Sequence, residues 1–378
     1  MKSILLDIKF KGNGIVNFDD NSRPLQIMNN LGIINYDETK YDNVKVAKHN
    51  YYPIPTTDNE KKDKWGYKVV VSSDCLRNAI FGAVPTNEIT ANDYLLHTYL
   101  TSPQAICRGY LFTGNDDEKS PKLNIKRASP LTITSAEQED INTVFNAPKN
   151  TREGERNNTS LRRTEIIGVK HYVATGRIDL HKLMFISSDV KCDRLAFNPD
   201  MVISGKLSGF FTQNYGDIAK IKWGYFVPKV NLLHYAQPES GVLLNNELVD
   251  HLAKLMLHSI FNIRINRATA TFGVETLRIK LVDDPYTQTE QSEEGWITIN
   301  SDKDIDELPP IYPDEFYTEV TEKDIEDYKK AFADFMTELK EAKKKLKEAK
   351  KKADKSKKKN GETEELTEET VTETDENA

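Results

Sequence analysis

Two small groups of side chains have the types and spacing that could do chemistry. Asp189 and Asp193 lie around a Lys-Cys pair near the end of an apolar run, where a carboxylate could hold a metal ion for RNA cleavage. His251 and His258 are seven residues apart in one helical stretch, which places two imidazoles roughly on one face as an acid–base pair. Each group also has a simpler interpretation, as a hydrogen-bonded turn and as packing beside an apolar stripe. We favour the simpler interpretation for both.

Sequence motifs of the common enzyme classes are absent. The chain has no G-x-S-x-G nucleophile motif, no H-E-x-x-H metal motif and no glycine-rich phosphate loop of the G-x-x-x-x-G-K-[ST] or G-x-G-x-x-G type. Gly12-Asn13-Gly14 is interpreted as a flexible turn. The three cysteines lack CxxC spacing and indicate a reducing compartment. We therefore expect no catalytic residue, no metal and no other cofactor.

Basic side chains carry a clearer signal. They gather in short groups beside Gly, Ser, Thr and Asn, and backbone N–H groups and hydroxyls there can join a guanidinium on one phosphate. The stretch 152–163 has almost no apolar side chain before Leu161, so we expect a loop that an anion orders. The residues expected to line an RNA-binding groove are Arg77, Arg108, Lys126, Arg127, Arg162, Arg163, Lys229 and Arg267.

The charge of the chain is strongly partitioned. The net charge is −7, which argues against a globally basic nucleic-acid surface. Residues 341–360 hold eleven lysines and three acids, a formal +8, whereas residues 361–378 hold eight acids and no base, a formal −8. Residues 1–340 therefore carry −7, and a nucleic-acid site among them has to be a local groove.

Alternating strands and helices must position these groups. The period-two pattern Ile4-Leu6-Ile8-Phe10 predicts a strand, and the wide apolar stripe of residues 246–262 predicts a helix. Further strands are expected over residues 67–71, 105–112, 183–187 and 269–282, and further helices after Ser72 or Ser73 and over residues 90–100, ending before Pro103. This order indicates an α+β fold with a ferredoxin-like core over residues 1–320 and long insertions.

The C-terminal end is expected to form a segment separate from the domain of residues 1–320. Residues 321–360 predict a charged helix whose apolar face ends near Leu346, and residues 361–378 predict a disordered acidic tail. The lysine-rich run could touch phosphates, but a solvated helix neutralised by its own tail is the favoured interpretation. No apolar run approaches the length of a membrane span, and the N-terminal run is too short for a signal peptide, so we expect a cytoplasmic protein without a membrane partner.

Several segments together resemble a known family. They are K-F-K-G-N-G-I-V-N-F at 9–18, V-S-S-D-C-L-R-N-A-I-F at 71–81, C-R-G-Y-L-F at 107–112, K-R-A-S-P-L at 126–131, I-D-L-H-K-L-M-F-I-S-S-D at 178–189 and S-G-V-L-L-N-N at 240–246. In this order, over about residues 1–285, the chain resembles the crRNA-coating backbone subunit of type I CRISPR interference complexes, a member of the RAMP superfamily. The likeness is to the minimal type I-F variant form.

The resemblance implies a fold and a set of partners. The fold would be an RRM-like palm with a thumb hairpin, here residues 11–66, and a finger insertion, here residues 113–165. Copies would stack head to tail along the crRNA, each thumb displacing one nucleotide, and the guide would pair with target DNA. Other implied partners are a guide-end cap and a crRNA-processing endonuclease. Arg77, Arg108, Lys126 and Arg127 fall inside matched segments, and the expected thumb residues are Lys45, Lys48, His49 and Tyr51.

Features outside the pattern keep alternatives open. The lysine-rich helix and acidic tail are not part of the minimal family, and the palm lacks the aromatic pair with which RRM proteins stack bases, so binding should be directed at the RNA backbone. The expected function is sequence-independent crRNA binding without chemistry. The alternatives are an RNA-guided ribonuclease that uses Asp189 or Asp193, and a filament or tube protein that binds no nucleic acid.

Overall fold

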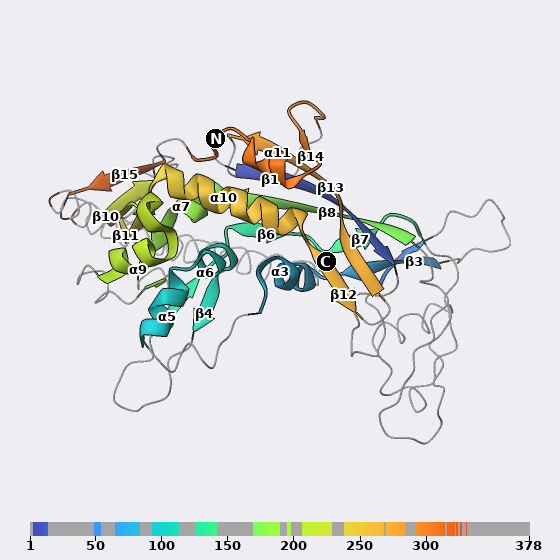
Figure 1. Cartoon of the computed structure of the whole chain (residues 1–378), viewed down its shortest axis with the longest axis horizontal. Coiled ribbons are helices and arrows are strands. Elements are labelled where there is room, and N and C mark those ends of the chain that lie inside the picture. Colours follow the sequence, from blue (N-terminus) through green and yellow to red (C-terminus); the bar gives the residue numbers. More distant parts are fainter. Residues whose placement is uncertain are drawn as a thin grey trace, which may run out of the picture. The chain divides into compact units, whose positions relative to one another are not determined.

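The computed structural model describes the chain in separate stretches (Figure 1). These are residues 3–13, 49–53, 65–83, 93–112, 125–141, 169–189, 195–197, 206–228, 238–267, 270–283, 292–313 and 316–321, with the single positions 323, 326 and 330. The chain divides into two compact units. One is Met1–Gly224 with Ser240–Phe316, and the other is Tyr225–Glu239 with Tyr317–Ala378.

Strands and helices alternate along the described stretches. The strands are β1 (Ser3–Asn13), β2 (His49–Pro53), β3 (Trp65–Val71), β4 (Tyr110–Phe112), β5 (Ile125–Arg127), β6 (Leu131–Ile133), β7 (Ala136–Gln138), β8 (Val169–Asp179), β9 (Phe185–Ser187), β10 (Ile221–Pro228), β11 (Glu239–Leu244), β12 (Arg264–Arg267), β13 (Ala270–Val282), β14 (Ile297–Ile299) and β15 (Tyr317–Val320). The helices are α3 (Ser73–Phe81), α5 (Asp93–Leu100), α6 (Pro103–Arg108), α7 (Leu180–Met184), α9 (Lys206–Tyr215), η1 (Gly216–Ile218), α10 (Asn246–Phe261) and α11 (Asp302–Asp306).

β1 lies in the middle of the largest sheet of the described residues. The order is β12-β13-β1-β8-β7-β3-β2, with β14 beside β13 and β6 beside β8. β1 is antiparallel to both neighbours, and its Leu6 lies opposite Ile279 of β13 and Gly176 of β8. The first residues of β1 are buried on both faces, and beyond Asp7 the burial alternates, as the sequence pattern predicts. The predicted first strand is confirmed.

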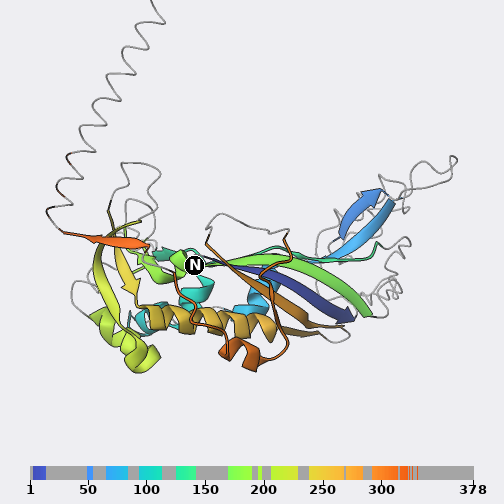
Figure 2. The same cartoon turned by 90° about the horizontal axis from the view of Figure 1, so that it is seen from above.

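α10 is the main helix of the first unit. It packs against α3, α6, α7, α11 and β13, and it runs in the same general direction as the long strands β1, β8 and β13 (Figures 1 and 2). Its Leu248, Leu252, Met256 and Ile260 are buried, because four-residue steps place them on one side of the helix. The helix predicted over residues 246–262 is confirmed.

The strand predicted over residues 105–112 is wrong for its first half. Residues 103–108 form α6, and only Tyr110–Phe112 form a strand, β4. Pro103 begins this helix rather than stopping the one before it, because proline lacks an N–H group that the first helical turn leaves unbonded in any case. Ser102 caps α6 by accepting the N–H of Ala105 at 3.2 Å.

Two other predicted elements differ in the structure. Residues 180–184 form α7 before the strand β9, because the carboxylate of Asp179 accepts the N–H groups of His181 and Lys182 and so starts a helix. β9 pairs with β11 and lies outside the largest sheet. The flexible turn predicted at residues 12–14 is wrong for Gly12, which continues β1, and a Cβ there would lie 3.1 Å from the rings of Phe272 and Tyr172.

The fold class is confirmed at the level of a mixed α/β protein with antiparallel sheets. Strands β5, β6 and β7 lie within the range expected for the finger, and β2 and β3 form an antiparallel pair within or next to the range expected for the thumb. Most of the remaining residues of both ranges, and nearly all of the predicted C-terminal helix and tail, lie outside the described residues. Among the described helices, none is long and apolar enough to cross a membrane.

A histidine bridge holds α11 to α10. His258 contacts Asp302 through Nδ1 at 2.8 Å and Asp306 through Nε2 at 2.9 Å, and Asn262 donates to the same Asp302 oxygen at 2.6 Å. Both ring nitrogens can donate only when the imidazole is protonated. Burial lowers the pKa of His258, but the hydrogen bonds to the two aspartates outweigh this effect and raise the pKa above its ordinary value. The structure therefore replaces the predicted packing role of His258 with an ionic one.

We predict that this bridge makes stability depend on pH. A raised folded-state pKa adds stability that is complete below the unfolded-state value of about 6.5 and is lost as the pH rises through the folded-state pKa. His258→Gln should therefore lower the melting temperature at pH 5.5 and have a smaller effect at pH 8.5. Melting followed by circular dichroism across this range measures the difference. An effect of the same size at both pH values would contradict the bridge.

Candidate nucleic-acid interface

Arg77 is positioned by a capped helix in the first unit. The Ser72 hydroxyl accepts the N–H of Cys75 at 3.3 Å and starts α3, as predicted, while Leu76 and Ile80 face the core. Arg77 is half-buried, and its guanidinium donates from Nη1 to the carbonyl of Leu131 at 3.0 Å and from Nη2 to the carbonyl of Arg108 at 2.8 Å. The side chain thus ties α3 to the end of α6 and to β6.

Arg108 ends α6 next to Arg77. Its Nη2 donates to Oδ1 of Asn78 at 2.9 Å, and its Nη1 donates to the carbonyl of Gly82. Burial lowers the pKa of Arg77, and the nearby charge of Arg108 lowers it further, while Asp74 acts in the opposite direction. Two guanidinium groups close enough to repel each other create a positive potential that an anion such as phosphate would relieve. This pair is the core of the candidate interface.

Gly109 turns the chain sharply between Arg108 and the hairpin β4–β5. Its φ is +77°, a region that favours glycine, and a Cβ there would lie 2.5 Å from the carbonyl oxygen of Arg127 and 2.7 Å from the nitrogen of Ser129. The backbones of the two matched segments around residues 107–112 and 126–131 therefore touch at this glycine. The arrangement brings Lys126 and Arg127 near the end of α6.

Arg127 points into the protein. It is 9% exposed, and it donates from Nε to the carbonyl of Ile106 at 3.0 Å, from Nη1 to that of Phe185 at 3.4 Å and from Nη2 to that of Lys182 at 2.7 Å. A buried guanidinium is stable only when such bonds are made. The structure gives Arg127 an internal role in holding α6, α7 and β9 together, and its predicted contact with RNA remains untested.

Lys126 points to the other side of the hairpin. It lies opposite Leu111 of β4, whose side chain is 63% exposed, and directly opposite residues of an antiparallel pair share a face. Arg127 lies opposite the buried Tyr110 on the inner face. Lys126 therefore stands on the solvent side of the hairpin, half-buried, and its RNA contact remains a prediction.

The other residues predicted to contact RNA lie only partly within the described stretches. Arg267 lies in β12, and His49 and Tyr51 lie in β2 opposite Val69 and Tyr67 of β3, which places them on one hairpin as expected for a thumb. The side chains of these three residues lie outside the described part of the chain, as do Lys45, Lys48, Arg162, Arg163 and Lys229 altogether. The structure thus brings together Arg77, Arg108, Lys126 and Arg127 of the predicted set.

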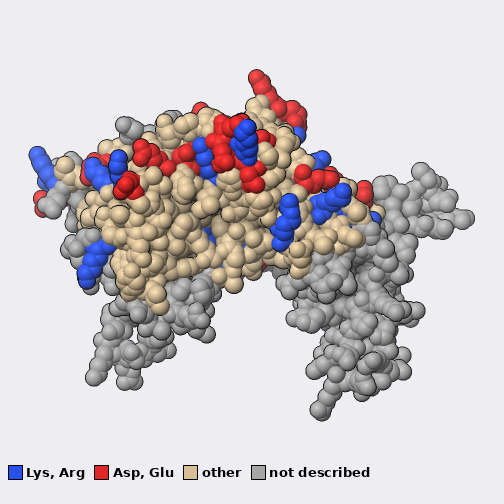
Figure 3. All heavy atoms as spheres, viewed as in Figure 1, with Lys and Arg blue, Asp and Glu red and all other residues tan. Residues whose placement is uncertain are grey.

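Acidic side chains gather in another part of the first unit. Figure 3 shows them over α11 and the segment that leads into β14, with some Lys and Arg side chains among them. Asp302, Asp306, Glu307, Glu293 and Glu294 are all exposed there. Such a surface repels phosphate, so the arginines of α3 and α6 are better placed to meet nucleic acid. The sequence did not reveal this separation, because the acids come from segments that are distant from those of the arginines.

The candidate catalytic groups do not assemble in the described residues. Asp189 donates its backbone N–H to the hydroxyl of Ser187 at 3.3 Å, as in a local turn, and Asp193 lies outside the described stretches. His251 is exposed, with its ring 6.4 Å from that of Tyr215, and so is not the partly buried packing residue predicted. Burial raises the pKa of the Cys107 thiol to about 12, so it stays protonated. No group of three or more His, Cys, Asp and Glu side chains in these stretches is arranged to hold a metal ion.

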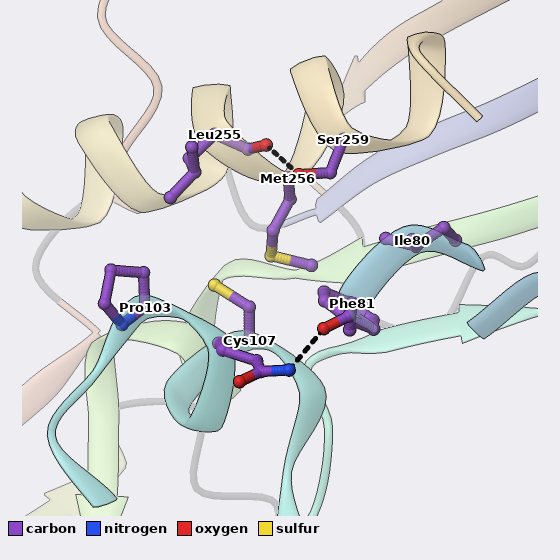
Figure 4. Close-up of a pocket in the computed structure, with 8 residues that line it drawn as sticks. Ile80, Phe81, Pro103, Cys107, Leu255, Met256 and Ser259 are labelled. Atoms are coloured by element: carbon purple, nitrogen blue, oxygen red, sulfur yellow. Dashed lines mark hydrogen bonds between the residues drawn. The ribbon is translucent and has the colours of Figure 1, made fainter. Parts of the chain in front are cut away.

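Sequence reasoning missed a pocket beside the arginine pair. It lies between α10 on one side and α3 and α6 on the other, with a volume of about 220 Å³ (Figure 4). Its lining residues are Ile80, Phe81, Pro103, Gln104, Cys107, Leu255, Met256 and Ser259. Because each helix contributes only a few of these side chains, no single sequence segment shows the pocket.

We predict that Arg127 and Arg108 differ in their effect on stability. Arg127→Met removes the donors of three buried carbonyls, each of which costs about 1–3 kcal/mol when left unbonded, so we expect a loss of about 3 kcal/mol or more in the free energy of unfolding. Arg108→Met, whose bonds are exposed, should cost about 1 kcal/mol or less. Urea unfolding measures both. Equal losses would contradict the internal role of Arg127.

Comparison with known proteins agrees with the resemblance seen in the sequence. Residues 1–304 match the family model described as type I-Fv CRISPR-associated protein Cas7fv-like. A search of curated proteins gives no match. The matched residues include α3, α6 and the hairpin β4–β5, and therefore the whole arginine cluster, whereas the charged C-terminal end lies outside the match. The chain belongs to the Cas7fv-like family, the Cas7 backbone subunits of type I-Fv CRISPR systems.

Proposed function

We propose that this protein coats crRNA without regard to its sequence, as the repeating subunit of a type I-Fv antiviral complex. The observation that carries the proposal is the close pair of Arg77 and Arg108 at the junction of α3 and α6, inside the region that matches the family. A guanidinium pair binds phosphates, which every nucleotide has, and leaves the base edges free for pairing with DNA. Binding of this kind suits a subunit that accepts any guide.

The proposed complex extends along the guide. Copies of the chain stack head to tail on the crRNA, because a contact between unlike surfaces generates an open series. The finer architecture that we propose is an RRM-like palm built on the sheet around β1, with the β2–β3 pair at the base of a thumb and a finger within residues 113–165. Further proposed partners are target DNA, a guide-end cap and a crRNA-processing endonuclease, all in the cytoplasm. The proposal includes no chemistry by this subunit.

We predict that RNA affinity falls steeply with salt and that Arg108 contributes to the slope. Arg108→Gln should lower RNA affinity about fivefold at low salt. It should also reduce the slope of the logarithm of the binding constant against the logarithm of the salt concentration by about 0.7, the value for one phosphate contact on a single strand. The loss should be equal for unrelated RNA sequences. Filter binding between 50 and 300 mM salt measures this.

Arg278→Gln is the matched control for this measurement. Arg278 forms ion pairs with Asp7 at 3.5 Å and with Glu293 at 2.9 Å, near the gathered acids. Its loss should leave the salt dependence of RNA binding unchanged. A slope that changes equally in both variants, or a loss limited to one RNA sequence, would contradict backbone recognition by Arg108.

We predict that the protein purified from its host carries RNA. The absorbance ratio and the extracted nucleic acid, with and without a high-salt wash, should show discrete protected RNA with repeat-derived ends. The wash should remove much of it, since phosphate contacts are salt-sensitive.

Two results would contradict the proposal. A monodisperse protein that takes up no single-stranded RNA at low salt would leave a filament or tube protein as the better interpretation. Periodic cutting of complementary RNA by the assembled complex with Mg²⁺, abolished by Asp189→Ala, would contradict the absence of chemistry.

A further inference from the structure

The pocket between α3, α6 and α10 has the size of a single apolar side chain. Its volume is about 220 Å³, and an apolar cavity of about 150 Å³ is enough for a benzene ring. Figure 4 shows the sulfur atoms of Cys107 and Met256 and the ring of Phe81 turned toward the space between the helices. Apolar atoms dominate this lining, so an apolar group would gain free energy by leaving water for it.

Polar groups at the pocket are already used within the chain. The Gln104 amide donates to the carbonyl of Phe81, and the Ser259 hydroxyl donates to the carbonyl of Leu255 at 2.9 Å. A nucleobase placed here would give up hydrogen bonds with water and gain few in return. An alkyl or aryl side chain of a protein suits the pocket better than a base.

The rim of the pocket is positively charged. Arg108 directly follows Cys107 of the lining, and it holds the end of α3 by its bond to the Gly82 carbonyl, next to Phe81. Arg77 stands close by. An apolar side chain with a carboxylate beside it would therefore complement both the pocket and its rim.

This chain exposes apolar side chains of its own that a neighbouring copy could receive. In the described residues the large ones are Tyr94, Leu95, Leu111, Ile141, Val169, Trp223, Tyr225, Ile297 and Tyr312. Tyr94 and Leu95 lie on α5, which packs on α6, and Leu111 follows α6 by three residues. Because α6 itself lines the pocket, two copies that exchanged one of these three residues would meet through the same surface and form a closed pair, not an open series.

Neighbouring charges separate the remaining candidates. Val169 and Trp223 stand next to Lys170 and Lys222, whose charge opposes that of Arg108. The residues on both sides of Tyr225, Ile297 and Tyr312 are uncharged, so no adjacent carboxylate complements Arg108 there.

Ile141 fits the pocket and its rim. It is 40% exposed and directly follows the exposed Asp140, whereas the carboxylate of Glu139 lies 3.9 Å from the Lys9 ammonium group. It lies three residues past the end of β7, and β7 runs antiparallel to β3, away from the start of α3. Figure 1 shows β7 and α6 on opposite sides of α3, so the strand that leads to Ile141 and a helix that lines the pocket are separated within one unit.

We infer that the segment Glu139-Asp140-Ile141 of one copy docks on the next copy, with Ile141 in the pocket between α3, α6 and α10 and the carboxylate of Asp140 beside Arg108. The inference rests on the proposed function, since it names the contact between successive subunits. Unlike surfaces that meet in this way form an open series. Docking would place a carboxylate on the same α3–α6 junction that is proposed to hold the guide, so this carboxylate and a phosphate would share the paired cations Arg77 and Arg108. The gain in affinity for a long RNA would come from the contacts between successive subunits along it.

The test separates assembly from RNA binding. Ile141→Asp should lower the apparent affinity for a long single-stranded RNA at least tenfold, while affinity for an RNA that fits one subunit stays within twofold. Ser259→Phe, which fills the pocket from α10, should have the same effect. Ile297→Asp is the control, because Ile297 is 37% exposed but has no charged neighbour, and it should bind both RNAs as the wild type does.

A photo-crosslinker gives a second readout. Ile141→benzoylphenylalanine in the assembled complex should crosslink to peptides that contain Phe81, Cys107 or Met256 of another copy. Crosslinks to other segments or to RNA would overturn the inference, as would an Ile141→Asp protein that assembles like the wild type, or an Ile297→Asp protein that alone fails to assemble. If the wild type binds neither RNA, the proposed function fails and this contact fails with it.

Discussion

The guanidinium of Arg127 draws together three segments that are far apart in the sequence. It donates to carbonyls that lie 21, 55 and 58 residues away, in or beside α6, α7 and β9. A buried guanidinium without these bonds would cost several kcal/mol, so the three backbones have to converge on it. Arg108 ends one of these helices and Lys126 precedes Arg127 on its strand. The positions of Arg108 and Lys126 in the candidate interface therefore depend on the buried Arg127.

The same junction shows how neighbouring basic residues come to differ in role. Side chains alternate along a strand, so Lys126 stands on the solvent side of the hairpin while Arg127 faces Tyr110 inside. Gly109 makes this possible, because its positive φ and missing Cβ let the end of α6 touch the backbone of residues 127–129. Arg77 is intermediate, with part of its guanidinium bonded to carbonyls and a like charge next to it. One cluster thus serves both the fold and the proposed contact with phosphate.

Charge separation explains how an acidic chain can offer a site for RNA. The net charge is −7, yet the acids of α11 and of the segment before β14 gather together (Figure 3), where Arg278 and the His258 ring, whose pKa is raised, lie beside them. The arginine pair at α3 and α6 is supplied by other segments. A local positive potential of this kind acts over about one Debye length, roughly 8–10 Å at physiological salt, which suffices for phosphates that lie in contact.

Patterns that are local in the sequence predicted local structure well. The alternation in β1, the apolar stripe of α10 and the Ser72 cap of α3 were read correctly, because each depends on the period of one element or on one turn. The family resemblance was also right, since it rests on the order of several segments. Predictions failed where one residue decided the boundary, as at Pro103, which starts α6, and at Asp179, which starts α7.

The roles of individual side chains were decided by the tertiary structure. Sequence reasoning treated Arg77, Arg108, Lys126 and Arg127 alike, because composition shows that a residue is basic and not which way it points. Burial of Arg127, repulsion between Arg77 and Arg108 and the ionic bridge of His258 each depend on groups more than 20 residues away. The sequence by itself therefore determined the main elements, the family and the presence of basic clusters. Only the tertiary structure decided which cations are bonded inside and which remain at the surface, because the partners that satisfy a buried charge come from distant parts of the chain.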